Sequence, residues 1–212
     1  ESLALLRDFD DADMDYHQYQ AARMFNVPYA AVTKSMRQQS KGINFGLPYG
    51  MGDESLGTRI FGERNKENTK KAADLRKKFF QGQELIEDFF EKVRSEGVRR
   101  GYTETQWGRR RYYHKGVFSV AEIRRQAGNH VIQGTAADIY KQAVNNMFVR
   151  ICKEGWLGKV LINGFIHDEM LMEVHKSINP YYFFKAWREE FEVKPSKYCR
   201  LYAGAGVGKC WY

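Results

Sequence analysis

Cysteine is scarce in this sequence, and long apolar runs are absent from it. The 212 residues include three cysteines, Cys152, Cys199 and Cys210, whose spacing fits neither a zinc site nor a disulfide framework. We therefore expect a reducing, cytosolic setting. No stretch approaches the roughly 18 to 20 apolar residues that a membrane-spanning helix needs, so no membrane association is expected. The first eight residues also lack the basic-then-apolar order of a secretory signal.

The composition is that of a folded protein with a basic surface. Hydrophobic residues make up 43% and charged residues 28%, which excludes a chain that is disordered throughout. Lys and Arg number 34 against 26 acidic residues, so the formal net charge is +8. This excess favours a polyanionic partner, because cationic side chains release counterions from a phosphate backbone, although a merely soluble basic protein is the alternative. Residues 94–113 mix arginines with aromatic rings, which suits phosphate contact and base stacking.

The hydrophobic periodicity predicts one compact, mostly helical α+β unit. The predicted helices cover residues 21–25, 33–48, 66–81, 83–99 and 120–153 and a last segment from Asn179, and the predicted hairpins cover residues 102–113 and 160–174. Pro48 has no N–H to donate, so it bends or ends the second helix. Gly134 interrupts the long helix in this prediction.

Three residues on the helix that Thr33 caps are candidates for binding a triphosphate. Arg37, Lys41 and Phe45 recur at every fourth position, so they share one helix face. Arg offers a bidentate fork to phosphate oxygens, Lys a compact charge, and a ring can stack on a sugar or base. The alternative is an ordinary solvated face with a buried phenylalanine.

A second triplet has the same spacing on the long helix. Arg125, Asn129 and Gln133 are long, polar side chains of the kind that hydrogen-bond to base edges and sugars in a minor groove. By itself this triplet is equally typical of a solvated helix surface.

An acidic tripeptide lies between two strand-like runs. Asp168 and Glu169 follow His167 at a predicted tight hairpin, where two adjacent carboxylates offer the oxygen ligands that magnesium or manganese prefers. A polar turn without function is the alternative.

Taken together and in this order, these motifs resemble the family A DNA polymerases, the group of bacterial polymerase I and phage replicases. Residues 37–50 match the family's motif B in the fingers, residues 125–138 match the helix that follows the fingers, and residues 167–169 match motif C in the palm. Residues 108–112 and 206–211 also resemble family sequence, so the matches cover nearly the whole chain. The resemblance implies a right-hand polymerase fragment of α+β class, with mostly helical fingers and an antiparallel palm sheet.

The same resemblance implies a domain division and a function. Residues 1–19 would connect palm to fingers after motif A, residues 20–118 would form the fingers, and residues 119–212 the palm with its C-terminal strand. The implied activity is template-directed addition of dNTPs to a primer 3′-hydroxyl by two-metal phosphoryl transfer, with two Mg²⁺ ions. The implied partners are template-primer DNA and dNTPs.

The resemblance also implies a role for each matching residue. Asp168, Glu169 and Lys41 would be catalytic, with Asp168 and Glu169 as metal ligands; Arg37, Lys41, Phe45, Tyr49 and His17 would bind the dNTP; and Arg125, Asn129, Gln133, His167, Arg109 and Arg110 would bind DNA. Phe rather than Tyr at position 45 implies discrimination against dideoxynucleotides.

The sequence departs from the family pattern at its start and at Pro48. We find no motif A aspartate: Glu1 could only close that motif, and Asp8 lies too near His17 to replace it. We therefore expect one metal ligand and an N-terminal thumb and palm portion to lie outside this chain, which would be inactive in isolation. Pro48 stands where a larger aliphatic residue is commoner, and is expected to alter the helix before Tyr49.

The segment before residue 20 is shorter than in the cellular enzymes, which indicates a phage or mobile-element source. The expected location is then the cytoplasm, in association with the nucleoid, or the host cytoplasm for a phage protein.

Two other functions remain open from the sequence. A single-subunit RNA polymerase shares the spacing of Arg37 and Lys41, but Phe45-Gly46 and Glu169 favour a DNA polymerase. A non-catalytic module that binds template-primer DNA would also account for the basic charge and the missing motif A.

Overall fold

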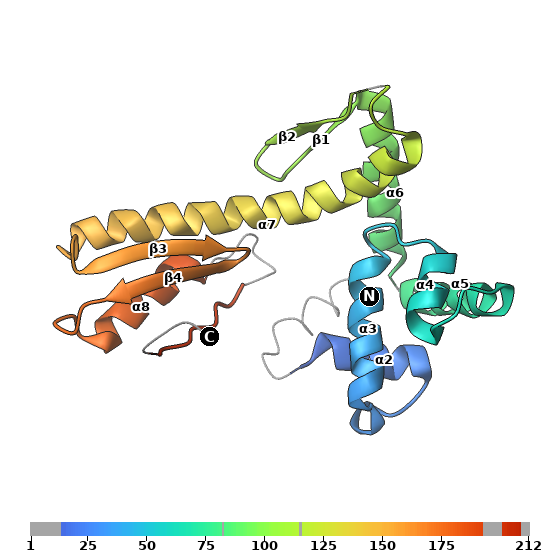
Figure 1. The fold of residues 1–212 in the computed structure, drawn as a ribbon, viewed down its shortest axis with the longest axis horizontal. Coiled ribbons are helices and arrows are strands. Elements are labelled where there is room, and N and C mark those ends of the chain that lie inside the picture. Colours follow the sequence, from blue (N-terminus) through green and yellow to red (C-terminus); the bar gives the residue numbers. More distant parts are fainter. Residues whose placement is uncertain (1–13, 82, 115, 193–200, 209–212) are drawn as a thin grey trace. The chain divides into compact units, whose positions relative to one another are not determined.

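The computed structural model describes residues 14–81, 83–114, 116–192 and 201–208. The chain divides into two compact units, residues 1–135 and 136–212, rather than the single unit predicted, and helix α7 (Val120–Lys153) runs from the first into the second (Figure 1). The expected boundaries at residues 19 and 118 remain predictions. No helix in the described ranges is long and apolar enough to cross a membrane. Glu1, Asp8, Cys199, Cys210 and Trp211 lie outside the described residues.

The first unit is built from helices that begin at polar caps. They are α2 (Tyr16–Phe25), the 3₁₀ turn η1 (Tyr29–Ala31), α3 (Lys34–Gly46), α4 (Asp53–Phe61), α5 (Lys66–Phe80) and α6 (Glu84–Arg100). The side chains of Asp15, Thr33 and Asn65 accept hydrogen bonds from backbone N–H groups of α2, α3 and α5, which satisfies donors that no helical carbonyl reaches. The predicted cap at Thr33 and the break between α5 and α6 are confirmed.

Helix α3 ends just before the proline that was predicted to bend or end it. Gly46 is its last residue, Leu47 still has helical dihedral angles, and Pro48 is the second residue of the turn that follows. Because proline has no N–H, the chain cannot continue the helical hydrogen bonds there, and Gly50 completes the turn with a φ of 85°.

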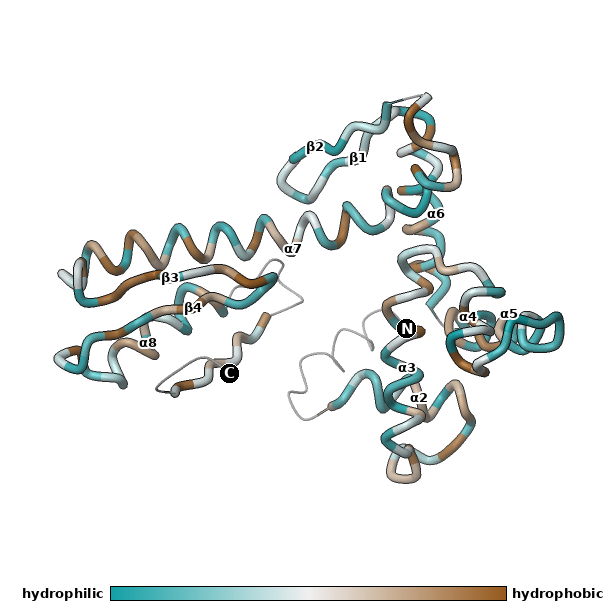
Figure 2. The backbone as a smooth tube through the Cα atoms, in the orientation of Figure 1, coloured by the Kyte–Doolittle hydropathy of each residue, from teal (hydrophilic) through white to brown (hydrophobic). Residues whose placement is uncertain are grey.

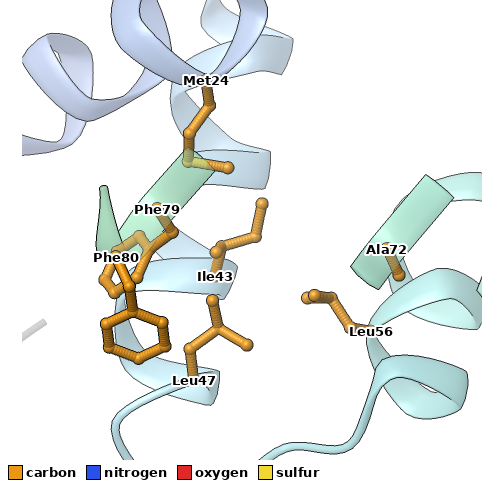
Figure 3. Close-up of a cluster of buried hydrophobic side chains, with 7 residues drawn as sticks. All are labelled: Met24, Ile43, Leu47, Leu56, Ala72, Phe79 and Phe80. Carbon is orange, nitrogen blue, oxygen red and sulfur yellow. The ribbon is translucent and has the colours of Figure 1, made fainter. Parts of the chain in front are cut away.

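One hydrophobic cluster holds α2 to α5 together. Ile43 and Leu47 of α3 pack against Met24 of α2 and against Phe79 and Phe80 of α5, as Figure 3 shows. The two phenylalanine rings meet edge to face, with centroids 4.9 Å apart. In the same cluster Leu56 of α4 faces Ala72 of α5. Helix α4 was not predicted from the sequence.

A second cluster joins α6 to the first part of α7, with a short hairpin beside them. Strands β1 (Tyr102–Glu104) and β2 (Arg110–Tyr112) are antiparallel, and are shorter than the predicted runs. A Cβ added to Gly97 of α6 would lie 2.9 Å from the Cβ of Ala127, so the two helices are close enough to require glycine there. Helix α7 is continuous through Gly134, so the predicted interruption is wrong. A Cβ at Gly134 would lie 2.8 Å from Cγ2 of Thr105, and this close approach explains the glycine.

The second unit is a hairpin covered by two helical segments. Strands β3 (Val160–Ile166) and β4 (Glu169–Val174) pair antiparallel with a bulge between Ile162 and Gly164, and α8 (Pro180–Phe191) follows. Figure 1 shows α8 and the end of α7 running beside the hairpin, and Figure 2 shows β3 as mostly hydrophobic. The core is formed by buried residues of α7, β3, α8 and the segment before α8, against which Met170 and Met172 of β4 pack: Met147, Ile151, Val160, Ile178, Phe183 and Trp187.

Candidate functional site

The predicted triphosphate stripe lies on the open face of α3. Ile43 and Gly46 point into the core, whereas Lys41 is exposed and Phe45 is 48% exposed. The interpretation of this stripe as a solvated face with a buried phenylalanine is therefore wrong for Phe45. Within the described ranges, no carboxylate forms a salt bridge with Lys41. The charge of Lys41 and the ring of Phe45 are both available to a ligand.

Arg37, the first residue of the stripe, has an anionic partner from α2. Its Nε donates to Oδ2 of Asp15 at 2.6 Å, and both side chains keep 30–42% of their surface exposed. Oδ1 of the same carboxylate accepts from the backbone N–H of Gln18 at 3.1 Å and so caps α2. A carboxylate thus occupies one donor of Arg37 in a position that an anionic ligand could take instead.

His17 lies beside the stripe and contacts its aromatic end. The His17 and Phe45 rings have centroids 5.6 Å apart, and Nδ1 of His17 accepts from Nδ2 of Asn44 at 2.8 Å. The neutral ring then carries its proton on Nε2, so that atom is a donor. Partial burial lowers the pKa of His17, and the nearby cations of Arg37 and Lys41 lower it further against the opposing charge of Asp15.

The carboxyl group of Asp15 is shifted toward its charged form. Partial burial raises its pKa, but the hydrogen bonds from Arg37 and the Gln18 backbone and the charge of Arg37 outweigh burial, so the pKa lies below its usual 3.8. Asp15 is therefore ionised at neutral pH beside the cationic stripe.

The predicted minor-groove triplet lies on the exposed side of α7. Arg125, Asn129 and Gln133 are all exposed, whereas Ala127 and Gly128 between them are buried. Nε2 of Gln133 donates to the hydroxyl of Tyr49 at 2.6 Å, so the structure brings together two residues that the sequence assigned to different roles.

The two hairpin arginines both have partners within the protein. Arg109 donates to the carbonyl of Gly134 at 2.9 Å, which attaches the hairpin to α7. Arg110 donates to Glu104 at 2.7 Å and lies over the ring of Tyr102, 4.8 Å from its centroid. Both residues are exposed, so phosphate contact would have to share or replace these partners.

The acidic tripeptide forms the turn of the second unit's hairpin. Ile166 pairs with Glu169, which leaves His167 and Asp168 as a two-residue turn, and His167 has a φ of 55° in the left-handed region. Asp168 and Glu169 are exposed. The hydroxyl of Tyr140 on α7 donates to the backbone carbonyl of Glu169 at 2.9 Å and fixes the base of the turn. Burial and the charge of Asp168 raise the pKa of Tyr140.

The donor set at this turn fits a divalent cation in part. Two adjacent carboxylates are the hard oxygen ligands that Mg²⁺ takes. Among the described residues no group of three or more His, Cys, Asp or Glu side chains could hold a metal ion. The further metal ligand, an aspartate of motif A, is expected to lie outside this chain.

Four residues that support the candidate site were not predicted as site residues from the sequence. Asp15 carries a sequence signal, since an aspartate followed by a helical pattern is a typical N-cap. Asn44, Arg94 and Tyr140 carry none, because their partners His17, Pro48 and Glu169 lie 27 to 46 positions away.

An exposed cationic stripe and an acidic hairpin turn are features of proteins that bind phosphate groups and metal ions. Comparison with known families is more specific. The family described as DNA polymerase family A matches residues 1–212, and the chain belongs to that family.

Individual relatives agree with this assignment. The thermostable DNA polymerase I of Thermus aquaticus is 36% identical over 176 residues, which cover 81% of this chain and 20% of the relative. DNA polymerase I of Bacillus caldotenax is 34% identical over 170 residues, covering 77% of this chain and 18% of the relative. The chain thus spans about a fifth of the length of these curated relatives.

A solved structure has a similar fold. It is described as the POL domain of Pol1 from M. smegmatis in complex with DNA primer-template and dNTP, and the similarity has a TM-score of 0.76 at 29% identity. The match covers 89% of this chain and 32% of that chain. The predicted family and the predicted α+β polymerase fold are both confirmed.

Proposed function

We propose that this chain supplies the fingers and palm of a template-directed DNA polymerase that adds dNTPs to a primer 3′-hydroxyl. The observation that carries the proposal is the open face of α3, where Arg37, Lys41 and Phe45 lie in a row beside His17. The family assignment supports it, and so does the similarity to a polymerase domain that was solved with DNA primer-template and dNTP.

The first unit would hold the incoming nucleotide. The triphosphate would take the place of the Asp15 carboxylate on Arg37 and would also contact Lys41 and Nε2–H of His17. Cations fixed on a helix stabilise charge that develops on the phosphates without reorganising during the reaction, so Lys41 acts as a catalytic residue. Phe45 would pack on the sugar and base, and its lack of a hydroxyl would disfavour dideoxynucleotides.

The exposed polar face of α7 would contact template-primer DNA. Arg125, Asn129 and Gln133 would donate to minor-groove acceptors, which are nearly the same for all base pairs, so they would hold DNA without choosing its sequence. Tyr49, bonded to Gln133, would stack beside the templating base. His167, Arg109 and Arg110 would add further contacts to the DNA.

The second unit would supply metal ligands. Asp168 and Glu169 would bind Mg²⁺, with the remaining carboxylate contributed from outside the described residues. Bound Mg²⁺ ions would activate the primer hydroxyl and neutralise charge on the leaving pyrophosphate. Tyr140 would hold the turn in place through the Glu169 carbonyl.

Primer extension tests this function in the protein as its gene encodes it. We expect extension with dNTPs and Mg²⁺, and a loss of at least about a hundredfold in Asp168→Asn and in Lys41→Ala, as for other lost transition-state contacts. Asp88→Asn and Lys70→Ala are matched controls, since both side chains are exposed and neither belongs to the stripe on α3 or to the acidic turn. Retained extension in Asp168→Asn would refute the proposal.

The same assay separates the two alternatives. Preferential use of NTPs on the same template would indicate an RNA polymerase relative. A non-catalytic binding module would bind DNA with an affinity that falls steeply with salt but ignores Mg²⁺ and dNTP. We expect instead that the matching dNTP and Mg²⁺ tighten binding to primed DNA.

A further inference from the structure

We propose that Arg94 of α6 is a positioning residue that fixes the turn after α3, and with it Tyr49, and so sets how strictly the polymerase selects the matching nucleotide. The inference rests on the proposed function, in which Tyr49 lies beside the templating base. Arg94 belongs to none of the motifs that assigned the other site residues.

The side chain of Arg94 binds backbone rather than a carboxylate. Its Nη2 donates to the carbonyl of Pro48 at 2.6 Å and lies 3.5 Å from the carbonyl of Leu47. Within the described ranges Arg94 forms no salt bridge, and its guanidinium lies over the ring of Phe90, 5.4 Å from the centroid. Burial lowers the pKa of Arg94, and the charge of Glu91 opposes this effect. The guanidinium is therefore partly shielded from solvent.

A cation is favoured near the end of α3. The last carbonyls of a helix have no N–H partner within the helix, and they form the negative end of its dipole. Pro48 cannot extend the helix to provide such a partner. The carbonyls of Gly46 and Leu47 accept from the N–H groups of Met51 and Gly50. Arg94 adds a charged donor to the next carbonyl, that of Pro48, from a helix 46 residues further along the chain.

Helix α7 lies against the same carbonyl of the turn. A Cβ added to Gly128 would lie 3.4 Å from the carbonyl oxygen of Pro48, so the turn rests against α7 where that helix has no side chain. One turn beyond, Gln133 donates to the hydroxyl of Tyr49 at 2.6 Å.

Tyr49 is thus held at both its backbone and its hydroxyl. Its amide nitrogen belongs to the peptide group whose carbonyl Arg94 binds, and the tip of its ring is bound by Gln133. Loss of Arg94 frees the backbone side, so the ring samples more positions. A mismatched base pair, which differs from a matched one in shape, is then rejected less strongly.

The test compares Arg94→Met, Arg94→Lys and the control Arg124→Met in the protein as its gene encodes it. Met keeps the aliphatic part of the side chain but loses its donors. Lys keeps the charge and one donor. Arg124 sits at the same pair of helices, and among the described residues its side chain pairs with the exposed Glu91 rather than with backbone.

The main readout is the ratio of kcat/KM for the matching dNTP to kcat/KM for a mismatched one. We expect Arg94→Met to lower this ratio about tenfold, the size expected for losing a hydrogen bond from a charged donor, mainly through a higher kcat for the mismatch. The dissociation constant for primed DNA should change less than about twofold. Arg94→Lys should restore most of the ratio, and Arg124→Met should leave it unchanged.

Amide hydrogen exchange of the unliganded protein tests the anchor without any catalysis. Peptides that span residues 46–52 should exchange faster in Arg94→Met but not in Arg124→Met, while peptides that span residues 102–112 stay unchanged. If the ratio of kcat/KM for matched and mismatched dNTPs is the same in Arg94→Met as in the parent, the inference is wrong even if amide exchange rises. Arg94 would then stabilise the turn without affecting nucleotide selection. If the parent protein extends no primer, the proposed function fails, and the inference about nucleotide selection fails with it. If amide exchange of residues 46–52 is also the same in Arg94→Met as in the parent, Arg94 does not hold the turn either.

Discussion

Asp15 and Arg37 join the start of α2 to the cationic face of α3 through a 2.6 Å salt bridge. The two residues lie 22 positions apart, and the carboxylate also caps α2 through the backbone N–H of Gln18. One side chain therefore has two separable tasks: its shape supports a helix, and its charge competes with any anion that approaches Arg37.

The first prediction separates those two tasks. Asparagine caps helices as well as aspartate does, so Asp15→Asn should lose only the partly exposed ion pair with Arg37 and lower the free energy of unfolding by a few tenths of a kcal/mol. Asp15→Ala also loses the cap, so it should lower the free energy of unfolding by about 1 kcal/mol more. Because Asp15→Asn removes a negative charge beside the proposed phosphate site, we expect its KM for dNTP to fall two- to fivefold, about the worth of a partly exposed ion pair. Urea unfolding and steady-state extension measure the two effects. A KM that rises tenfold would mean that Asp15 positions Arg37 rather than competing for it.

The second prediction concerns stability below neutral pH. The folded chain holds the pKa of His17 below the usual 6.5. At pH values between the lowered pKa of the folded chain and the usual pKa of the unfolded chain, the unfolded chain therefore binds more protons. Stability therefore falls as the pH drops from about 6.5 through the lowered pKa of His17. Asp15, whose pKa is also lowered, contributes stability above its usual 3.8 that is lost as the pH falls further, so its effect comes in a separate, more acidic window.

Urea midpoints measured at pH 7.5 and pH 5.5 check this dependence. His17→Gln should reduce the loss of stability between the two pH values, because glutamine does not titrate. His175→Gln is the matched control, since His175 is exposed and lies outside the α2–α3 contact. An equal loss in the parent and in His17→Gln would show that other groups cause it.

Those parts of the candidate site that lie on a single helix or hairpin could be predicted from the sequence. The stripe of Arg37, Lys41 and Phe45 follows from helical spacing alone, and the turn at His167 follows from two flanking strand patterns. The supporting contacts could not be predicted in the same way. The pairs formed by Asp15 with Arg37 and by Arg94 with Pro48 exist only once separate helices have packed.

The errors in the fold prediction have physical causes too. Glycine lowers helix propensity by about 1 kcal/mol, and a glycine lies at the interruption predicted at Gly134 and also at Gly57, in the middle of the unpredicted helix α4. In both places the glycine admits a neighbour that a Cβ would meet within 2.8 Å: Thr105 at Gly134, and the Asn68 backbone at Gly57. Packing outweighs intrinsic propensity there, and a single sequence does not show packing.

The third prediction tests the support beneath the acidic turn. Tyr140→Phe removes the hydrogen bond to the Glu169 carbonyl and should lower the free energy of unfolding by about 1 kcal/mol. Because the turn that carries Asp168 and Glu169 is then held less rigidly, kcat for extension should fall while the affinity for primed DNA is unchanged. Tyr181→Phe is the control, since Tyr181 is 71% exposed. Equal unfolding energies for Tyr140→Phe and the parent would show that the bond contributes nothing.

The fourth prediction separates the backbone of His167 from its imidazole. A non-glycine residue at a φ of 55° is strained, and an ordinary side chain costs about 1 kcal/mol there relative to glycine. His167→Gly and His167→Ala both lack the ring, but only glycine fits the turn without strain. His167→Ala should therefore unfold about 1 kcal/mol more easily than His167→Gly.

If the imidazole contacts DNA as proposed, both variants should bind primed DNA equally more weakly than the parent, whatever their difference in stability. Fluorescence anisotropy with labelled primer-template measures that binding. If His167→Gly binds DNA as well as the parent does and His167→Ala does not, the ring is dispensable. In that case the role of His167 is to shape the turn that presents Asp168 and Glu169, and its assignment to DNA binding is wrong.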